Sequence, residues 1–460
     1  MHIAQPTIDI ENFYQPKDST TSKNTKNSSD DFYTSLKPFA DKMQIGDFSI
    51  TKANINQIQH IDKQNTKQQK INETNFNLAG LTIDTDSKTF RAEDIGFDTE
   101  NLHLPVMNGF YTLELGKIRV SKKSGNIYLS DIHLNPAYPK MEFAHYHPTH
   151  KDWFDVTLGE INLSGIDSEA YFSDKILKAK KLTVNDVVLQ NFKNQKIEIQ
   201  HNIMPLIYEG LQKMPLKIDI DSAETNNFTV IYEELAKKGD KLAQILFEGM
   251  NGKLSGVTNI VSRPNQYIVL KADGKFMGAG YFTAEWDIPV DSLNDHFRLS
   301  AHIHPLDLRE LNRIVSPLAP AEVKSGNLND LKFTTNATSK DAEINMLFLY
   351  DDLHINVFKD IKTQQPQKFY TLLANTVIRS NNPNKRGKKP RYADNVTLIR
   401  DPYHSTFNYF WQILQPAMIE SVGVSQGEQN FLKKTSNFFS KVKNFFTGKK
   451  KKDDKKNKDK

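Results

Sequence analysis

The chain has 460 residues, of which 38% are hydrophobic and 10% aromatic. The low hydrophobic fraction, combined with 28 phenylalanines, favours sheets with one solvent-exposed face over a compact α/β enzyme. The absence of cysteine excludes disulfides, zinc–thiolate sites and a cysteine nucleophile.

The formal net charge of +5 is concentrated at one end of the chain. Lys449–Lys460 contains eight lysines and three aspartates, so the rest of the chain is neutral in total. A folded nucleic-acid-binding domain usually spreads basic residues over a surface. We therefore expect no nucleic-acid partner, and we expect residues 449–460 to form a disordered, lysine-rich tail.

The first 43 residues are expected to contain one strand, Thr7–Ile10, followed by a polar and partly disordered segment. Lys17–Asp31 is rich in Ser, Thr, Asn and Lys, which are residues that cannot bury a core. Phe39–Asp47 resembles a short helix or turn that leads into a strand.

Residues 44–200 are expected to form a first region of β-repeats, because short segments alternate between apolar and polar residues. The expected strands are Phe48–Ile55, Phe76–Ile83, Phe90–Phe97, Tyr111–Val120, Ile127–Leu134, Phe154–Leu163, Lys181–Leu189 and Lys196–Ile199. Leu115–Leu134 and Leu158–Leu189 share the cadence Leu-Gly-x-Ile-x-apolar-Ser. This repetition predicts successive β-hairpins that stack edge to edge.

Residues 201–402 are expected to form a second β-repeat region. In Met214–Asn259, the residues Ile218 and Ile220 alternate with polar neighbours, and Asn226-Asn227 predicts a turn. Val230 and Tyr232 resume the alternation after it. Met204–Met214 and Leu306–Ile314 are expected helices, and further strands are expected at Lys217–Ile220, Thr229–Glu233, Ala243–Leu254, Tyr267–Ala272, Gly278–Trp286, Phe297–His304, Lys332–Thr335, Glu343–Tyr350 and Leu353–Phe358.

Residues 403–448 are expected to be helical. Tyr403–Val424 reads as a helix that is bent at Pro416, and a basic amphipathic helix is expected after it. The residues of that second helix that would face a membrane surface are Phe438, Phe439, Phe445, Phe446, Lys441 and Lys443. The alternatives for this end of the chain are a solvated tail without a partner and, less favoured by the pattern, nucleic-acid binding.

No pattern in the chain indicates catalytic or metal chemistry, and we expect no enzyme activity, cofactor or metal. Gly423–Gly427 matches the G-x-S-x-G elbow, but a helix precedes it where the elbow needs a strand. The histidines of His145–His150 are interrupted by Pro148, which favours a solvated loop over a metal site. His302 and His304 are expected on the solvated side of a strand. Paired acids such as Glu233 and Glu234 are expected to decorate a wet face.

Several stretches resemble the AsmA-like superfamily, in the branch with DUF748-type repeats found in Bacteroidetes envelope proteins. Met214–Glu234 resembles a strand–turn–strand unit of that family, and Gly252–Ile260 and Gly278–Pro289 resemble its next repeats. His302–Phe333, with its Pro-Leu-Asp-Leu start and Ser-Gly-x-Leu end, is similar to a further segment. Ile378–Leu414 is similar to the closing strand, Arg-Asp and terminal helix.

The resemblance implies an elongated, twisted antiparallel β-sheet that forms a groove, with few short helices and a C-terminal amphipathic helix. It implies a periplasmic, membrane-associated protein of lipid transport and outer-membrane biogenesis, without catalytic residues. The relatives carry an N-terminal anchor helix, so we expect such a segment upstream of Met1. The lipid, the direction of transfer and the partner proteins are not specified by the sequence.

The leading hypothesis is a noncatalytic envelope protein that binds or conducts phospholipid or another lipid along an apolar groove. Candidate groove residues are Ile218, Ile220, Val230 and Tyr232. The alternative is an envelope scaffold or assembly factor that pairs with protein partners through its sheet edges.

Overall fold

The structure is a computed structural model that describes most of the chain. The described residues are 1–12, 33–60, 66–146, 151–197, 202–237, 239–291, 293, 295–359, 362, 364–385, 387–403 and 405–423. The polar segment Lys17–Asp31, the basic helix after residue 424 and the lysine-rich tail lie outside these residues, as do His147 and His150.

A single long sheet of 18 strands dominates the described part of the chain. In chain order it contains β1 (His2–Ala4), β2 (Thr7–Asn12), β4 (Phe48–His60), β5 (Thr66–Ala79), β8 (Asp94–Val106), β9 (Tyr111–Ser121), β10 (Asn126–Pro136), β11 (Trp153–Ser164) and β12 (Ile176–Asn194). It continues with β13 (Lys217–Leu235), β14 (Leu242–Thr258), β15 (Tyr267–Phe276), β16 (Gly280–Pro289), β17 (Phe297–Ile303), β18 (Leu306–Asp307), β19 (Ala321–Ala337), β20 (Asp341–Val357) and β21 (Tyr392–Ile399).

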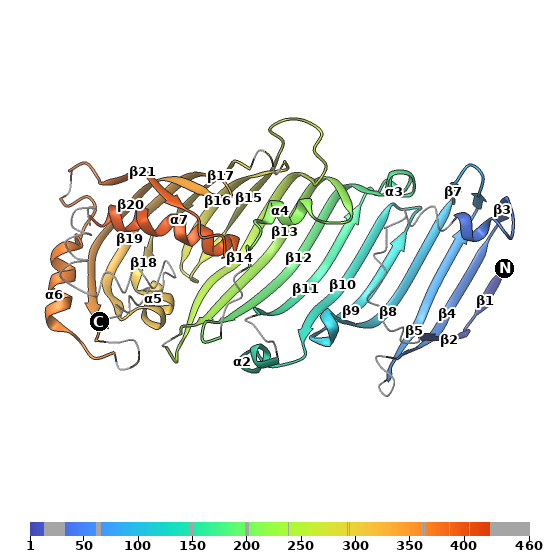
Figure 1. Ribbon diagram of the computed structural model, residues 1–460, viewed down its shortest axis with the longest axis horizontal. Helices are drawn as coiled ribbons and strands as arrows, with labels where there is room; N and C mark the ends of the chain where they lie inside the picture. The colour runs from blue at the N-terminus through green and yellow to red at the C-terminus, as the bar shows by residue number, and fades with distance from the viewer. Residues whose placement is uncertain are drawn as a thin grey trace, which may run out of the picture.

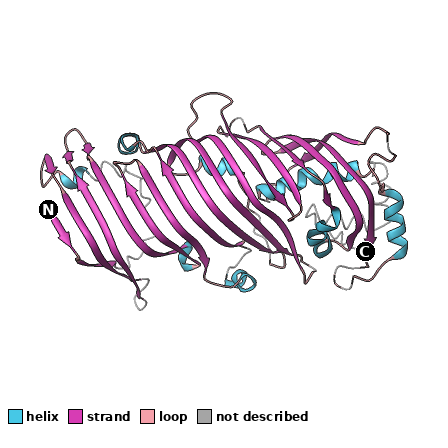
Figure 2. Ribbon diagram, turned by 180° about the vertical axis from the view of Figure 1, so that it is seen from behind, coloured by secondary structure: helices cyan, strands magenta, loops and turns pink. Residues whose placement is uncertain are grey.

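The strands follow one another across the sheet almost in chain order, so the molecule is elongated at right angles to its strands. Figure 2 shows them side by side without interruption from the N-terminal end to the C-terminal end. β1 and β2 lie end to end along the outer edge of β4 at one end, and β21 pairs with β20 at the other. The predicted fold class, a mainly β, elongated and twisted sheet with a few short helices, is confirmed.

Three strand pairs are parallel, which the sequence did not predict. β1 and β2 run parallel to β4, and β12 runs parallel to β13. Between β12 and β13 the chain returns to the starting edge through residues 195–216 and the helix α4 (Ile207–Gln212). This crossover joins the two predicted β-repeat regions, 44–200 and 201–402, into one sheet.

The predicted turn at Asn226-Asn227 is wrong, because both residues lie inside β13, a single strand of 19 residues. Asn227 has a φ of 58°, and its amide donates a hydrogen bond of 2.7 Å to Asp186 Oδ1 on β12. Asparagine tolerates this left-handed conformation, which serves a strand bulge as well as a turn. The dipeptide alone therefore cannot distinguish a bulge from a turn.

The bulge in β13 belongs to a line of kinks that crosses six neighbouring strands, which we call the kink row. At each position the register of the strand pairing skips one residue on both strands. The kink row consists of Asn101, Gly116, Asp131, Gly159, Asp186 and Asn227. The four Asn and Asp residues have φ between 53° and 58°. Gly116 and Gly159 separate the first three of them, whereas Asp186 and Asn227 are direct neighbours.

The kink row explains the repeated cadence in the sequence. Gly116 and Gly159 are the glycines of the two Leu-Gly-x-Ile motifs. A Cβ on Gly116 would lie 2.6 Å from the Cβ of Asp131, and one on Gly159 would lie 3.0 Å from the Cβ of Asp186. Each glycine therefore leaves room for the kinked aspartate on the next strand.

Two other predicted strands are interrupted. Phe76–Ile83 divides at Gly80, whose φ is 59°, so that a separate small sheet of β3 (Lys42–Ile45), β6 (Leu81–Asp84) and β7 (Thr89–Arg91) branches off. Phe90–Phe97 also divides, because β7 belongs to the small sheet and β8 to the long sheet. The turn or helix predicted at Phe39–Asp47 contains the strand β3.

Helices cover only part of the sheet. Besides α4 they include η1 (Met107–Gly109), α2 (Lys140–Phe143), η2 (Ala144–Tyr146), α3 (Ser168–Asp174), η3 (Leu308–Leu311), α5 (Asn312–Leu318), α6 (Lys368–Val377) and α7 (Thr406–Ser421), and residues 33–36 are helical as well. The helices predicted at Met204–Met214 and Tyr403–Val424 appear as α4 and α7. The one predicted at Leu306–Ile314 instead begins as the short strand β18 and continues through η3 into α5.

The main hydrophobic core lies under α7 at the C-terminal end. Tyr409, Ile413 and Ala417, spaced four residues apart on one side of α7, are at most 1% exposed. Phe410 sets its ring edge-on against Trp286 of β16, with the centroids 5.1 Å apart. In Figure 1, α7 lies across the front of the C-terminal strands.

Candidate functional site

One face of the sheet carries apolar residues along its whole length. Residues paired across neighbouring strands point to the same side of a sheet, so the strand register identifies the residues that share a face. A first row runs through Ile3, Ile50, Phe76, Phe97, Val120, Ile127, Leu163, Leu182, Ala223, Leu254, Leu270, Trp286, Leu299, Thr335, Ile344 and Val396. We call this side the apolar face.

A second row follows the first on the same face. It runs through Thr99, Ile118, Leu129, Ile161, Val184, Thr225, Gly252, Ala272, Ala284, Ala301, Phe333, Met346 and Ala393. The kink row preserves the face, because each kink adds one residue to the strand. Leu129 and Ile132, three residues apart on either side of Asp131, therefore both belong to it.

The apolar face is closed at its C-terminal end and open in its N-terminal half. Trp286, Ile344 and Met346 are buried beneath the helices. In β8–β12, Phe97 and Ile161 are only partly buried, whereas Leu115, Ile132 and Leu163 of the same face are buried. Figure 1 shows α2 and α3 at the two edges of these strands and no described helix across them. The first row is therefore a core at one end and a partly exposed surface at the other.

The opposite face is polar. Its cross-strand neighbours include the ion pairs Arg119–Asp98 at 2.8 Å and Lys181–Glu224. A hollow of about 620 Å³ over β13–β19 is lined by residues of both faces, among them Lys271 and Glu285 of the polar face and Ala272, Ala284 and Ala301 of the apolar face. This polar character is interrupted where β11 begins, because Trp153, Phe192 and Leu235 lie on the same side and form a separate buried apolar cluster there.

The structure places all four groove candidates of β13 on the apolar face. Ile218 and Ile220 lie beside Leu177 and Ala179 of β12, at the edge where β13 begins. Val230 pairs with Leu189 on one side and Phe247 on the other. The sequence missed the longer stretch of the face in β8–β12. The signal was present there, since the same alternation runs through those strands.

The expectation of a wet-face position is wrong for Glu234. Residues 230, 232 and 234 share one side of β13, and Glu234 is 8% exposed. It accepts hydrogen bonds from the Tyr232 hydroxyl and from Gln195 Nε2. Burial, reinforced by Glu234, holds the pKa of Tyr232 well above its usual range, so the hydroxyl remains a donor. Adjacent acids on a strand necessarily face opposite sides.

The histidines do not form a metal-binding cluster among the described residues. His302 and His304 lie on the polar face with their rings 4.1 Å apart. His302 Nε2 is 2.5 Å from Asp330 Oδ1, and Lys332 is 2.9 Å from the other carboxylate oxygen. Burial opposes ionisation of Asp330, but hydrogen bonds from Lys332 and His302 outweigh it and lower the pKa of its carboxyl.

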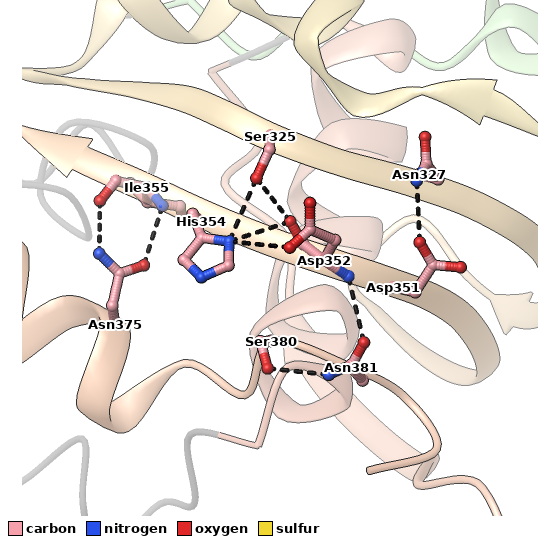
Figure 3. Close-up of polar contacts among 9 residues, drawn as sticks. All are labelled: Ser325, Asn327, Asp351, Asp352, His354, Ile355, Asn375, Ser380 and Asn381. Atoms are coloured by element: carbon pink, nitrogen blue, oxygen red, sulfur yellow. Dashed lines mark hydrogen bonds and ion pairs between the residues drawn. The ribbon is translucent and has the colours of Figure 1, made fainter. Parts of the chain in front are cut away.

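One polar cluster contains the residue types of a hydrolase triad. Ser325 Oγ is 3.1 Å from His354 Nδ1, and Asp352 Oδ1 is 3.3 Å from the same nitrogen (Figure 3). In a hydrolase triad the serine hydroxyl bonds one ring nitrogen of the histidine, which takes its proton. The acid bonds the N–H of the other ring nitrogen. Here Ser325 Oγ also bonds the Asp352 carbonyl oxygen at 2.7 Å. The cluster fits a stabilised strand kink, because Asp352 has a φ of 52°.

No model of a known protein family matches the chain, and a search of curated proteins finds no similar sequence. Within the described part of the chain, every helix falls short of the length and hydropathy that membrane crossing requires. The resemblance to the AsmA-like superfamily and the expected envelope location therefore stay predictions. The G-x-S-x-G motif can be followed only to Gly423, since residues 424–427 lie outside the described residues.

Proposed function

We propose that the protein is a noncatalytic lipid-binding protein whose open apolar face holds acyl chains. The observation that carries this proposal is the continuity of the two apolar rows from a buried core into a partly exposed surface. Large exposed apolar surfaces on a folded protein usually mark binding sites for apolar partners. The polar opposite face leaves the apolar face as the surface suited to an acyl chain.

The dimensions of the open part fit an acyl chain. The strands β4, β5 and β8–β12 are seven neighbours, which at about 4.8 Å each span on the order of 30 Å. An acyl chain in one leaflet is about 15 Å long, half of the hydrocarbon core. Apart from Thr99, the residues of the two rows in these strands are aliphatic or aromatic, as in apolar ligand sites. Lipid could therefore lie along the row direction.

Native mass spectrometry of the purified full chain tests this proposal. We expect bound phospholipid or another acyl lipid, and we expect Ile161→Lys to lower its occupancy several-fold. Asn162→Lys is the matched control, because residue 162 is the next residue of β11 and faces the polar side. Equal lipid occupancy in both variants, or no lipid in the wild type, would contradict the proposal.

The scaffold hypothesis keeps one observation in its favour. β21 pairs only with β20 among the described strands, and Tyr392 and Ile399 on it are 58% and 85% exposed. An exposed edge strand can add a strand from a partner. A photo-crosslinker at residue 397 that traps one defined envelope protein would favour a scaffold, whereas the lipid proposal predicts no stoichiometric protein adduct there.

Membrane association through the basic C-terminal helix also stays a prediction. The residues concerned lie outside the described residues. Deletion of Gln429–Lys460 is expected to weaken binding to anionic vesicles and to leave the circular dichroism of the β region unchanged. Undiminished vesicle binding after the deletion would contradict this role.

A further inference from the structure

A strongly basic loop lies at the C-terminal end of the sheet, between α6 and β21. It comprises residues 383–390, and we call it the basic loop. Residues 361–393 contain eight Lys and Arg residues and not one Asp or Glu. Four of these cations fall within five residues of the basic loop, namely Lys385, Arg386, Lys388 and Lys389. The proposed lipid binding gives this concentration of charge no role.

Hydrogen bonds hold the base of the basic loop in place. Asn382, which precedes the loop, is 0% exposed, and its Nδ2 donates to the Phe348 carbonyl at 2.6 Å. Asn382 Oδ1 accepts from the amide of Arg391, at the other end of the loop, at 2.8 Å. Within the loop, the Lys388 amide donates to the Lys385 carbonyl at 3.0 Å. A short, closed turn with a fixed base therefore carries the cations.

The lysines of the basic loop are not neutralised by the described part of the chain. Lys385, Lys388 and Lys389 are exposed, and none of them forms an ion pair with a described residue. By contrast, Lys362, earlier in the same acid-free stretch, lies 3.3 Å from Asp240 Oδ2. The three loop lysines are therefore available to an anion outside the chain.

Four acids around the base of the basic loop leave a positive balance. They are Asp351, Asp352, Asp394 and Glu420. Figure 3 shows the base at Asn381, whose Oδ1 accepts from the Asp352 amide at 3.1 Å. With Arg379 and Arg391, six cations stand against these four acids, which gives 6 − 4 = +2. The acids belong to the strands and the helix at the base, whereas the lysines lie at the tip.

The chain leaves the described residues beside this base. A Cβ on Gly423, the last described residue, would lie 2.7 Å from Arg379 Cγ and 3.5 Å from Arg391 Nε. Residues 424–460, which follow, contain twelve lysines and four acids. Positive charge from two parts of the sequence thus converges on the end of the sheet that β20 and β21 form, and the basic loop is the part of it that the structure describes.

We propose that the basic loop docks the C-terminal end of the sheet on the surface of an anionic lipid bilayer. Lysines are attracted to anionic headgroups within a Debye length, which is about 8 Å at physiological ionic strength. The tip of the loop meets this condition, because it carries lysines and no acid. The elongated sheet then stands end-on, with the open strands β8–β12 directed away from the bilayer.

Composition favours a bilayer over a nucleic acid as the partner. The basic loop contains no aromatic residue on which a base could stack. The segment that follows Gly423 carries five phenylalanines among its lysines, a combination that suits a membrane interface. The docking does not depend on the proposed lipid binding, since residues 383–390 contribute nothing to the two rows of the apolar face.

Vesicle flotation of the full chain tests the docking, with vesicles of phosphatidylcholine and phosphatidylglycerol in equal amounts as the probe. We expect Lys388→Glu/Lys389→Glu to bind at least about tenfold more weakly than the wild type, because two attractive charges become repulsive. Lys123→Glu/Lys178→Glu is the matched control, with the same change in net charge at two exposed lysines of the N-terminal half. It should bind within about twofold of the wild type, since charges beyond a Debye length are screened.

Two results would overturn the docking. One is an equal loss of binding in the loop variant and the control variant, because net charge alone would then explain the attraction. The other is unchanged vesicle binding by the loop variant. In that case, weaker binding of the same variant to oligodeoxythymidine would assign the basic loop to nucleic acid instead.

The end-on orientation has a separate test, because the chain contains no cysteine. A polarity-sensitive dye is attached to Tyr392→Cys, beside the basic loop, or to Phe39→Cys, near the N-terminal end. The native side chains at these positions are 58% and 83% exposed. On the mixed vesicles we expect only the dye at position 392 to shift its emission to shorter wavelength. An equal shift at both positions would contradict end-on docking.

Discussion

At the scale of single residues, the sheet depends on small and left-handed residues at fixed positions. From β8 to β12 the kink row alternates Asn or Asp at positive φ with glycine on the strand beside it, and it ends with Asn227 next to Asp186. Neither residue type would attract attention in one strand alone. Their role becomes clear only from the neighbouring strand. The Cβ of the kinked aspartate occupies the space that a side chain on the neighbouring glycine would need.

Gly116→Ala is expected to destabilise the fold by about 1–3 kcal/mol, as overpacking does. The added Cβ would lie 2.6 Å from Asp131 Cβ, so a strand must move. Urea unfolding followed by circular dichroism measures the change. Gly210→Ala in α4 is the control, because a Cβ there meets nothing within 4 Å. Asp131→Gly should restore stability to Gly116→Ala, and failure to do so would contradict the steric reason.

Asp84 is expected to titrate at a pKa of about 2, below the ordinary aspartate value. Its carboxylate accepts from the Ser87 amide at 2.8 Å and lies 3.2 Å from Lys42 Nζ. A lowered folded pKa means that the ionised form stabilises the small sheet. That contribution is complete above pH about 4 and is lost as the pH falls toward 2. Carbon-detected NMR titration measures it, and a midpoint near 4 would refute the turn geometry.

At the scale of elements, α7 decides which part of the apolar face is closed. Ile413→Ala is expected to cost about 2–5 kcal/mol, because the side chain is 1% exposed under the helix. Phe407→Ala on the same helix, 70% exposed, is expected to change the unfolding free energy by less than about 0.5 kcal/mol. Thermal or urea unfolding compares the two variants. A similar cost for both would mean that α7 does not pack as described.

Several elements could be predicted from the sequence, because alternation at period two is local. β9, β10 and β11 agree with their predicted bounds to within two residues. β13 and β12 were predicted too short, because each kink breaks the period by one residue. The parallel pair β12–β13 could not be predicted, since it depends on a crossover through α4 and not on either strand.

The candidate site was partly predictable for the same reason. Ile218 and Val230 were assigned correctly to an apolar side, because the alternation within β13 alone indicates it. The rows of the apolar face join residues up to hundreds of positions apart, such as Ile3 and Val396. The continuity of the rows depends on the register between strands. That register cannot be read from a single sequence.

At the scale of the whole molecule, one sheet is covered by helices at its C-terminal end, and we propose that it serves as a binding surface at the other. Its apolar rows need a covering layer everywhere, because about 25 cal/mol is lost for each Å² left in water. The helices supply that layer over the C-terminal strands. Acyl chains would supply it over β8–β12, which makes lipid a structural partner as well as a ligand.

Affinity is therefore expected to rise with acyl-chain length. Each buried methylene contributes about 0.8 kcal/mol, so two more carbons should tighten binding by up to about fifteenfold. Competition binding with a fluorescent fatty acid and unlabelled acids of increasing length measures this dependence. An affinity set by the headgroup and unaffected by chain length would contradict burial of the chain.

The most direct test of the central claim is photo-crosslinking with a phospholipid that carries a diazirine in its acyl chain, followed by peptide mapping. We predict adducts on residues of the apolar face in β9–β12, among them Leu129, Ile161 and Val184. Their neighbours on the polar face, such as Asn162 and Thr183, should remain unlabelled. Adducts spread over both faces, or confined to the polar one, would contradict the account.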